Sequence, residues 1–401
     1  MDLGRSDRAA AICEEVETVI ADEVAPITER HNDVLDNPVR KLDDEGLLVD
    51  DLVDAYREVV RIAGDHDLLG LQLPESAGGR GLSYVEQFHV RETVFEHGTG
   101  LSRYLSPIAA RGPTRLLLAL SDEKRREYLD PLLSGEKTAC LGLTEPRGGS
   151  DVGNMATTAE RQDDGSYRIS GHKKFVGNGP YADFVQLFAT TDPDAGVDGI
   201  TGFLVDMDQP GIERGPTNRD AMDKGEWCEL LLDECEVPSE NVIGEPGEGL
   251  SLLLPVLNKE RVMMAAQSSG LATYVNELSI EYANRRETWG RPIGTRQGVQ
   301  FPLADAAIDR QAIRLLGLWA AWCLDNEEAP ATAAAMAKVF ATEALADIAD
   351  TAVGVHGGDG MMKDGPFWQI YNQARAMQIY EGTNEILRRN IARDLGLDQA
   401  R

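Results

Sequence analysis

The segment Gln378–Ile386 near the C-terminus combines a carboxylate, a glycine and the start of a helix. Thr383 has the hydroxyl of an N-cap, and a helix is predicted beyond it because apolar residues recur every four positions, at Leu387, Ile391 and Leu395. Glu381 would then lie just outside the positive end of that helix, where Gly382 lets another group approach the backbone closely. A carboxylate held in this way is a candidate general base for removing a proton from carbon. The alternative is a surface loop that caps a helix.

The elements that must position this loop are predicted to be helices, then short strands, then helices again. In the first third, apolar residues at helical spacing predict several helices, one of which Pro26 is predicted to end. Between residue 139 and about residue 249, short alternating runs separated by glycine, proline and aspartate predict a small β-sheet. Long helices are predicted at 255–286, 302–325 and 331–353. The fold class is therefore α+β, with a helical domain at 1–138, a β-sheet domain at 139–249 and a second helical domain at 250–401.

A parallel Rossmann sheet is not expected, because no long helices separate the predicted strands. The chain also contains no glycine-rich phosphate-binding loop of the dinucleotide or Walker type. Any nucleotide cofactor must therefore be held by a different architecture.

Charge and cysteine content exclude several classes of function. The 401 residues carry a formal net charge of −29, which disfavours nucleic acid and anionic membranes as partners. No apolar run reaches the length of a membrane span, and residues 1–5 lack the basic-then-apolar pattern of a signal peptide. The five cysteines form no Cys-x-x-Cys pair and do not cluster with the six histidines. We therefore expect a cytoplasmic protein without a structural metal.

The acidic surface suggests adaptation to high salt. Acidic residues are spread along the chain, and arginine outnumbers lysine. Our hypothesis is that the protein works in a salt-rich cytoplasm, where screening weakens the repulsion within such a surface. An acidic protein from an ordinary cell is the alternative. Thermal unfolding separates them: adaptation predicts a higher Tm in molar KCl than in dilute buffer, and equal Tm values would exclude it.

Five segments together resemble the acyl-CoA dehydrogenase family over nearly the whole chain. In the family's order and spacing they are Gly142–Asp151, Gly171–Gly179, Arg286–Gly290 with Gln297 downstream, Val355–Gly360 and Tyr380–Thr383. Each segment alone is moderately specific, whereas five in the same order are very specific. The chain is therefore identified as similar to that family.

This resemblance implies an N-terminal helical domain, a middle β-sheet domain and a C-terminal four-helix bundle, with FAD between the sheet domain and the C-terminal helices. It also implies a homotetramer that oxidises acyl-CoA thioesters to 2-enoyl-CoA and passes electrons to an electron-transfer flavoprotein. Glu381 matches the family's base in its commonest position, which removes the α-proton while the β-hydrogen leaves as hydride to flavin N5. Charge on the thioester oxygen would be met by the backbone N–H of Glu381 and a flavin ribityl hydroxyl.

The resemblance also implies particular cofactor and substrate contacts. Thr144 corresponds to a residue that hydrogen-bonds the flavin ring, and Ser150 to one that contacts both flavin and acyl-CoA. Arg286 can pair with the FAD pyrophosphate, and the Gly357–Gly358 turn would reach the flavin of a neighbouring subunit. The implied cofactor-binding residues are Leu141, Leu143, Thr144, Gly149, Ser150, Phe175, Val176, Gly177, Arg286, Thr288, Gln297, Gly357, Gly358, Thr383 and Glu385. The implied substrate-binding residues are Ser150, Asn258, Arg261 and Gly382, with Arg261 facing the CoA portion.

Four features depart from the family pattern. Gly177 stands where members usually carry a Ser or Thr whose hydroxyl bonds flavin N5, and Gly354 replaces a glutamine that contacts the cofactor. Gln369 and Gln373 replace a basic and an acidic residue of an intersubunit charge pattern. Asn154 replaces a small residue after the first motif. These departures predict a divergent member and put the strength of flavin binding and of catalysis in doubt.

A second carboxylate, Glu260, occupies the position that serves as the base in the long-chain and isovaleryl branches of the family. If Glu260 and Glu381 faced one pocket, their titrations would be coupled. The intact loop favours Glu381, and Glu260 would otherwise be a helix-surface acid beside Lys259 and Arg261.

Two further functions remain open beside the dehydrogenase. One is a flavin oxidase or monooxygenase on the same fold, which would react with oxygen. The other is a non-catalytic flavoprotein subunit, which Gly177 and Gly354 favour and the intact Glu381 disfavours. The acyl group is not fixed by the sequence.

Overall fold

The computed structural model describes residues 2–35, 38–106, 108, 111–217, 224–362 and 365–397. The chain forms two compact units. The first, here called the helical unit, comprises Met1–Pro38, Ser83–Arg103 and Asn258–Arg401, and the second, the sheet unit, comprises Val39–Leu82 and Tyr104–Leu257. The predicted three-domain division at 138/139 and 249/250 stays a prediction, because each unit combines segments from distant parts of the chain.

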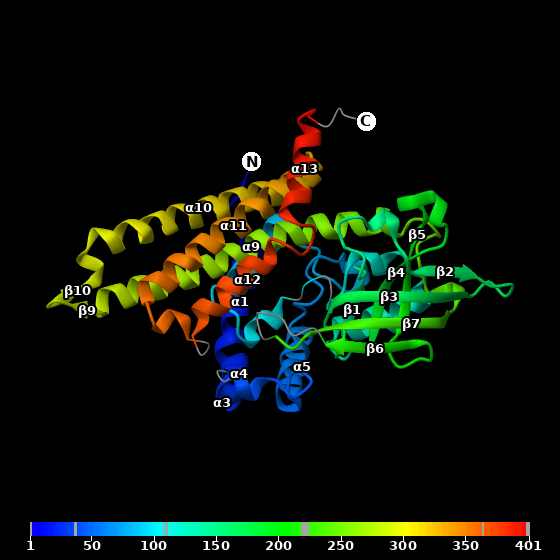
Figure 1. The fold of residues 1–401 in the computed structure, drawn as a ribbon, viewed down its shortest axis with the longest axis horizontal. Helices are drawn as coiled ribbons and strands as arrows, with labels where there is room; N and C mark the ends of the chain where they lie inside the picture. The colour runs from blue at the N-terminus through cyan, green and yellow to red at the C-terminus, as the bar shows by residue number, and fades with distance from the viewer. Residues whose placement is uncertain are drawn as a thin grey trace. The chain divides into compact units, whose positions relative to one another are not determined.

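The sheet unit is built on one eight-stranded sheet, in the order β6-β7-β3-β2-β4-β5-β8 with β1 paired to β4 (Figure 1). Apart from the parallel pairs β1–β4 and β2–β4, neighbouring strands are antiparallel. The sheet is therefore not of the Rossmann type, as the sequence predicts. The strands are β1 Ala139–Gly142, β2 Thr158–Arg161, β3 Tyr167–Gly177, β4 Phe184–Thr190, β5 Ile200–Asp206, β6 Ile212–Thr217, β7 Trp227–Val237 and β8 Val242–Ile243.

Two apolar cores stabilise the sheet unit. Every residue of β4 is buried, which is expected of a strand covered on both faces. One core contains Val185, Leu187 and residues of β3 and β7. The other joins Phe184 and Phe188 to the helical segments around Leu116–Leu132. The helices of this unit are α4 Pro38–Lys41, α5 Asp50–Asp65, α7 Asp122–Lys124, α8 Asp130–Leu133 and the first residues of α9 Gly249–Arg285.

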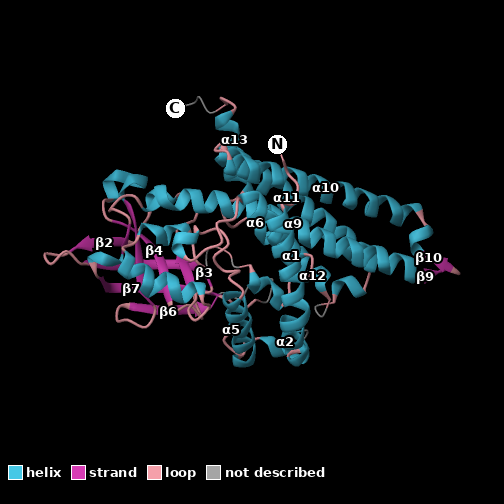
Figure 2. Cartoon of the chain, turned by 180° about the vertical axis from the view of Figure 1, so that it is seen from behind, coloured by secondary structure: helices cyan, strands magenta, loops and turns pink. Residues whose placement is uncertain are grey.

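The helical unit consists mainly of long helices. From Asn258 onward α9 runs beside α10 and α11, as Figures 1 and 2 both show. Helix α11 packs on α10, α12 and α13, and α6 packs on α1 and α10. Among the described residues, no helix has the length and apolar character needed to cross a membrane. The helices are α1 Asp7–Val19, α2 Ala25–Arg30, α3 Asn32–Leu35, α6 Tyr84–Phe95, α10 Gln297–Asp325, α11 Pro330–His356, α12 Pro366–Met377 and α13 Asn384–Asp394, with a hairpin of β9 Glu287–Thr288 and β10 Arg291–Pro292 after α9.

Pro26 does not end the first helix, contrary to the prediction. A π-helical turn, Ile20–Val24, follows α1 directly, and Pro26 lies in the first turn of α2. The wider π-helical turn lets the chain continue as a helix through this point.

Candidate active site

The loop between α12 and α13 carries Glu381 in an unusual backbone conformation. Thr383 caps α13 by accepting a hydrogen bond from the N–H of Ile386 at 3.3 Å, so the predicted N-cap is confirmed. Glu381 has φ 58° and Gly382 has φ 89°. The left-handed region is costly for a glutamate and easy for a glycine, so surrounding contacts must hold Glu381 in place.

Two buried cations hold consecutive carbonyl groups of this loop. Arg261 Nε donates to the carbonyl oxygen of Glu381 at 3.0 Å, and Lys338 Nζ donates to that of Gly382 at 2.8 Å. Arg261 also donates to Asn258 Oδ1 at 2.8 Å, which keeps its guanidinium in position. Two residues that the resemblance assigns to substrate binding, Asn258 and Arg261, thus lie together beside residues 380–382, here called the base loop because Glu381 is the candidate base.

The carboxyl group of Glu381 is poised for proton transfer. Its Oε2 atom is buried and has no hydrogen-bond partner among the described residues. Burial, and next the negative charge of Glu260, raise the pKa of Glu381 to about 7. A carboxylic acid with a pKa near neutrality is suited to take up and release a proton at physiological pH.

Glu260 lies in a different electrostatic environment. Lys259 Nζ is 2.7 Å from its Oε1, and Arg91 Nη1 is 3.3 Å from its Oε2. All three side chains are buried. Burial alone would raise the pKa of Glu260, but the charges of Lys259 and Arg91 more than offset burial and hold the pKa below its ordinary value. Glu260 is therefore an ionised partner of two cations, which leaves Glu381 as the better candidate base.

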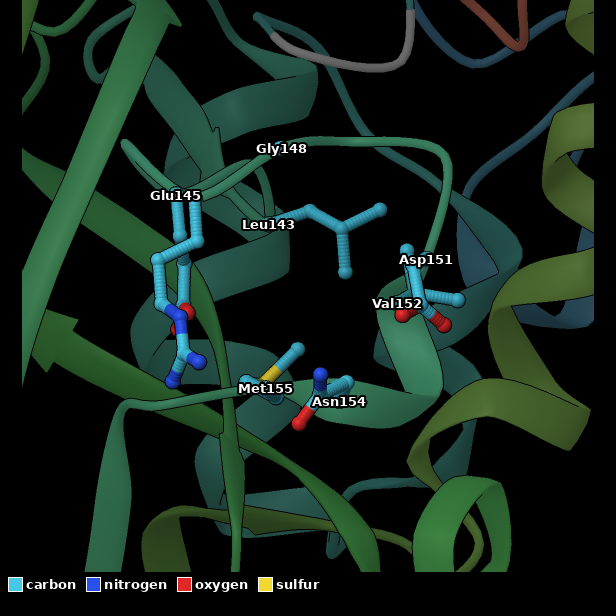
Figure 3. Close-up of a pocket in the computed structure, with 8 residues that line it drawn as sticks. Leu143, Glu145, Gly148, Asp151, Val152, Asn154 and Met155 are labelled. Carbon is cyan, nitrogen blue, oxygen red and sulfur yellow. The ribbon is translucent and has the colours of Figure 1, made fainter.

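In the sheet unit, the proposed flavin residues surround the end of β1. Leu141 belongs to β1, and Leu143, Thr144, Gly149 and Ser150 follow it. A cavity of about 190 Å³ opens beside this loop, and Figure 3 shows Leu143 and Met155 pointing toward each other across it. It is lined by Leu143, Glu145, Arg147, Gly148, Asp151, Val152, Asn154 and Met155.

A buried ion pair fixes the loop after β1. Lys173 Nζ donates to Glu145 Oε1 at 2.9 Å and to the carbonyl of Leu143 at 3.2 Å. Glu145 also accepts from the N–H groups of Ala156 and Thr157, at 2.7 and 2.9 Å. The two ends of the loop are thereby linked through the Lys173–Glu145 pair.

The end of β3 presents an aromatic surface. Phe175 has φ 56°, its side chain is 52% exposed, and its ring lies 6.3 Å from that of Trp227. Val176 is buried, whereas Gly177 pairs with Trp227 across the sheet. A Cβ added at Gly177 would lie 3.6 Å from Trp227 Nε1, an ordinary contact. Packing would therefore allow a side chain at position 177, so it does not explain why glycine replaces the usual Ser or Thr there.

The remaining proposed cofactor residues form two groups in the helical unit. Thr383 and Glu385 lie beside the base loop. The second group lies at the far end of α9, where the Tyr282 ring is 4.3 Å from that of His356. In α9, Arg285 lies 24 residues after Arg261. At the rise of an α-helix, this places the two residues about 36 Å apart along the helix axis. Members of the far group are Arg286, Thr288, Gln297, Gly357 and Gly358.

Sequence reasoning missed Lys338 and Arg91 as part of the site and gave Lys259 no role. Lys338 is the one charged residue in the apolar run Ala333–Val339, and Arg91 lies among buried residues of α6. A single charge inside an apolar helical run is the signal that could have identified Lys338, because buried charges need partners. Arg91 carries no such signal, because Glu92 follows it directly. No group of metal-ligating side chains that could hold an ion occurs within the part of the chain that is described.

Models of one protein family match nearly the whole chain. The acyl-CoA dehydrogenase N-terminal domain matches residues 6–136, the middle domain residues 140–235 and the C-terminal domain residues 247–396. An acyl-CoA dehydrogenase of Bacillus subtilis (strain 168) is 36% identical over 339 residues, 84% of this chain and 89% of that protein. A 3-(aryl)acrylate reductase of Clostridium sporogenes is 33% identical over 348 residues, 86% of this chain and 92% of that protein.

Solved structures agree with this fold. Butyryl-CoA dehydrogenase from Megasphaera elsdenii superposes with a TM-score of 0.86 at 27% identity, covering 98% of this chain and 100% of that chain. An acyl-CoA dehydrogenase of Bacillus anthracis complexed with FAD gives 0.83 at 27% identity, covering 97% and 67%. A chain from a structure of the electron transferring flavoprotein of Acidaminococcus fermentans gives 0.84 at 29% identity, covering 98% and 99%.

Proposed function

Because the chain belongs to the acyl-CoA dehydrogenase family and is a flavin-dependent enzyme of that family, we propose that it oxidises an acyl-CoA thioester to the 2-enoyl-CoA. In this proposal Glu381 removes the α-proton. One observation carries the proposal: Oε2 of Glu381 is buried and has no hydrogen-bond partner among the described residues, and the pKa of this carboxyl group is raised to about 7. Such a carboxylate can accept a proton near neutral pH without first giving up a hydrogen bond.

The chain's own residues supply a base and a hydrogen-bond donor. As the α-proton moves to Glu381, negative charge develops on the thioester oxygen. The N–H of Glu381 is a suitable donor to that oxygen, because no backbone hydrogen bond to a described residue uses it. Arg261, by holding the carbonyl of Glu381, orients both the carboxylate and the next peptide group. FAD, when bound, accepts the β-hydrogen as a hydride.

The residues present fit FAD, the family's cofactor. Phe175 offers an exposed aromatic face, and the exposed guanidinium of Arg286 suits a pyrophosphate. A Cβ added at Gly148, Gly357 or Gly358 would meet no described atom within 4 Å, so another group can approach the backbone there. We propose that the fifteen cofactor residues named from the resemblance hold FAD, and that Ser150, Asn258, Arg261 and Gly382 contact acyl-CoA.

The proposed assembly is the homotetramer that the family resemblance implies, and the spacing of the two cofactor groups in the helical unit supports contact between subunits. The base loop and the Arg286 group are too far apart for one FAD, so each group would serve a different flavin and each flavin would touch two subunits. Exposed apolar side chains on α10 support such an assembly. Phe301, Ile308 and Leu315 are seven residues apart and 60%, 65% and 48% exposed, so they lie on one helix face that a neighbouring subunit can cover.

The electron acceptor in this proposal is an electron-transfer flavoprotein. The structural likeness to a chain from the Acidaminococcus fermentans electron transferring flavoprotein structure supports that acceptor. A cytoplasmic location is supported by the five cysteines, all of which are free.

Anaerobic titration of the purified yellow protein tests the proposal. Short, long, branched and aromatic CoA thioesters are added in turn, and bleaching of flavin absorbance is followed. We expect bleaching by one class of thioester and slow reoxidation in air. Rapid reoxidation would instead indicate an oxidase or monooxygenase, and failure of every thioester to bleach the flavin would indicate a non-catalytic subunit.

The pH dependence of kcat/KM should report the base. Glu381 must be ionised to accept a proton, and its pKa is raised to about 7. Activity is therefore expected to rise with pH and to level off above that value, with about a tenfold loss one pH unit below it. Glu260, Lys259, Arg261 and Lys338 are the charged groups that face the carboxyl group. A profile that rises near the ordinary pKa of a glutamate would contradict this assignment.

A further inference from the structure

A fully buried lysine lies beside the base loop, and its two hydrogen-bond acceptors within the described part of the chain are neutral oxygens. Lys338, in α11, is 0% exposed. Its Nζ atom donates to the carbonyl of Gly382 at 2.8 Å and to Asn384 Oδ1 at 2.9 Å. Burial, and next the charge of Arg261, lower the pKa of Lys338 to about 7. Burying an amine in this way is costly for the fold, so its retention requires a reason.

The acceptors of Lys338 are themselves fixed. Asn384 Nδ2 donates to Thr342 Oγ1 at 3.2 Å and to Glu343 Oε1 at 3.0 Å. Arg388 donates two hydrogen bonds to the carboxylate of Glu343, at 2.7 and 2.6 Å. Side-chain hydrogen bonds therefore connect α11 to α13, and Lys338 connects α11 to the loop that precedes α13.

We propose that Lys338 is a positioning residue for the base: by holding the carbonyl of Gly382, it fixes the left-handed backbone at Glu381 and aims the carboxyl group. The inference rests on the proposed function in assuming that Glu381 is the base. Arg261 holds the preceding carbonyl from α9. The two cations thus secure the peptide groups on both sides of the turn, one from each neighbouring helix.

Lys338 keeps this hold in either protonation state. A neutral amine has two hydrogens, enough for the two acceptors. Only the charge changes, and the charged groups that face Lys338 are Arg261 from α9, Glu381 in the loop, Glu385 from α13 and Glu343 from α11. Removing the amine should therefore have two separable effects: the loop loosens, and Glu381 loses a nearby positive charge that lowers its pKa.

The test is Lys338→Met, which keeps the length of the side chain and removes the donors. Hydrogen exchange measured by mass spectrometry should be about tenfold faster in peptides covering residues 378–387 than in the wild type. We expect kcat to fall about 10- to 100-fold with little change in KM, and the midpoint of the pH profile to move upward. Lys338→Arg, which keeps a donor and a charge, should recover part of kcat.

Lys124→Met is the control for exchange, because Lys124 lies in the sheet unit, pairs with Glu127 at 2.9 Å and belongs to none of the proposed cofactor or substrate contacts. It should leave exchange in peptides covering 378–387 unchanged. Wild-type exchange and wild-type kcat in Lys338→Met would overturn the proposal. If that variant does not fold, Lys338→Gln answers the same question, since its shorter side chain places the amide nitrogen one bond short of the position of Nζ and so weakens the hold on both acceptors. The exchange measurement remains decisive for Lys338 even if no CoA thioester proves to be a substrate.

Discussion

Glu381→Gln is expected to slow anaerobic flavin reduction by a saturating CoA thioester about 10²- to 10⁴-fold, the range typical of a lost general base. Glutamine matches the shape of the glutamate but cannot accept the α-proton. The loop should survive, because its contacts from Arg261 and Lys338 go to backbone carbonyls and not to the replaced side chain. Stopped-flow absorbance under anaerobic conditions measures the effect.

Glu260→Gln is the matched control for this result. Glu260 is bound by two cations and held ionised, so its replacement should leave flavin reduction within a few fold of wild type. Since the charge of Glu260 raises the pKa of Glu381, the midpoint of the pH profile should also shift downward. Retained reduction in Glu381→Gln together with its loss in Glu260→Gln would transfer the role of base to Glu260.

Arg91→Met is expected to destabilise the fold by about 3 kcal/mol, near the lower end of the range for breaking a buried ion pair. The substitution leaves Glu260 buried with Lys259 as its remaining cation, at 2.7 Å. We therefore expect a substantial loss but not complete unfolding. Urea unfolding at fixed salt, with equal slopes for the two proteins, measures the difference.

Arg285→Met provides a control with the same separation of charges. Arg285 Nη1 lies 3.3 Å from Glu281 Oε1, the distance found between Arg91 and Glu260, but these side chains are 74% and 67% exposed. Its loss should change stability by less than about 0.5 kcal/mol. Equal effects of the two substitutions would show that burial does not determine the contribution of the Arg91–Glu260 pair.

Local signals in the sequence predict the elements around the site well. Thr383 is predicted to cap the last helix, and its side chain accepts the N–H of Ile386, three positions later. The short strands and the long C-terminal helices are likewise confirmed. These features depend on residues close together in the chain, which is why spacing alone identifies them.

The electrostatics of the site could not be predicted in the same way. The contact between Lys338 and Gly382 joins residues 44 positions apart, and that between Arg91 and Glu260 joins residues 169 positions apart. Only the packing of α9 with α6 and α11 in three dimensions decides which carboxylate is neutralised and which is left without a partner. Sequence motifs identified both acids as candidates and favoured Glu381, whereas the electrostatic reason for that preference comes from distances and burial.

The left-handed backbone of Glu381 has a consequence for protein engineering. Glycine would adopt its φ of 58° without strain and would remove a buried oxygen that has no partner among the described residues. Laboratory evolution of this chain for heat tolerance alone would thus tend to discard the carboxylate that we propose as the catalytic base. A thermostability screen therefore needs a parallel assay of product formation.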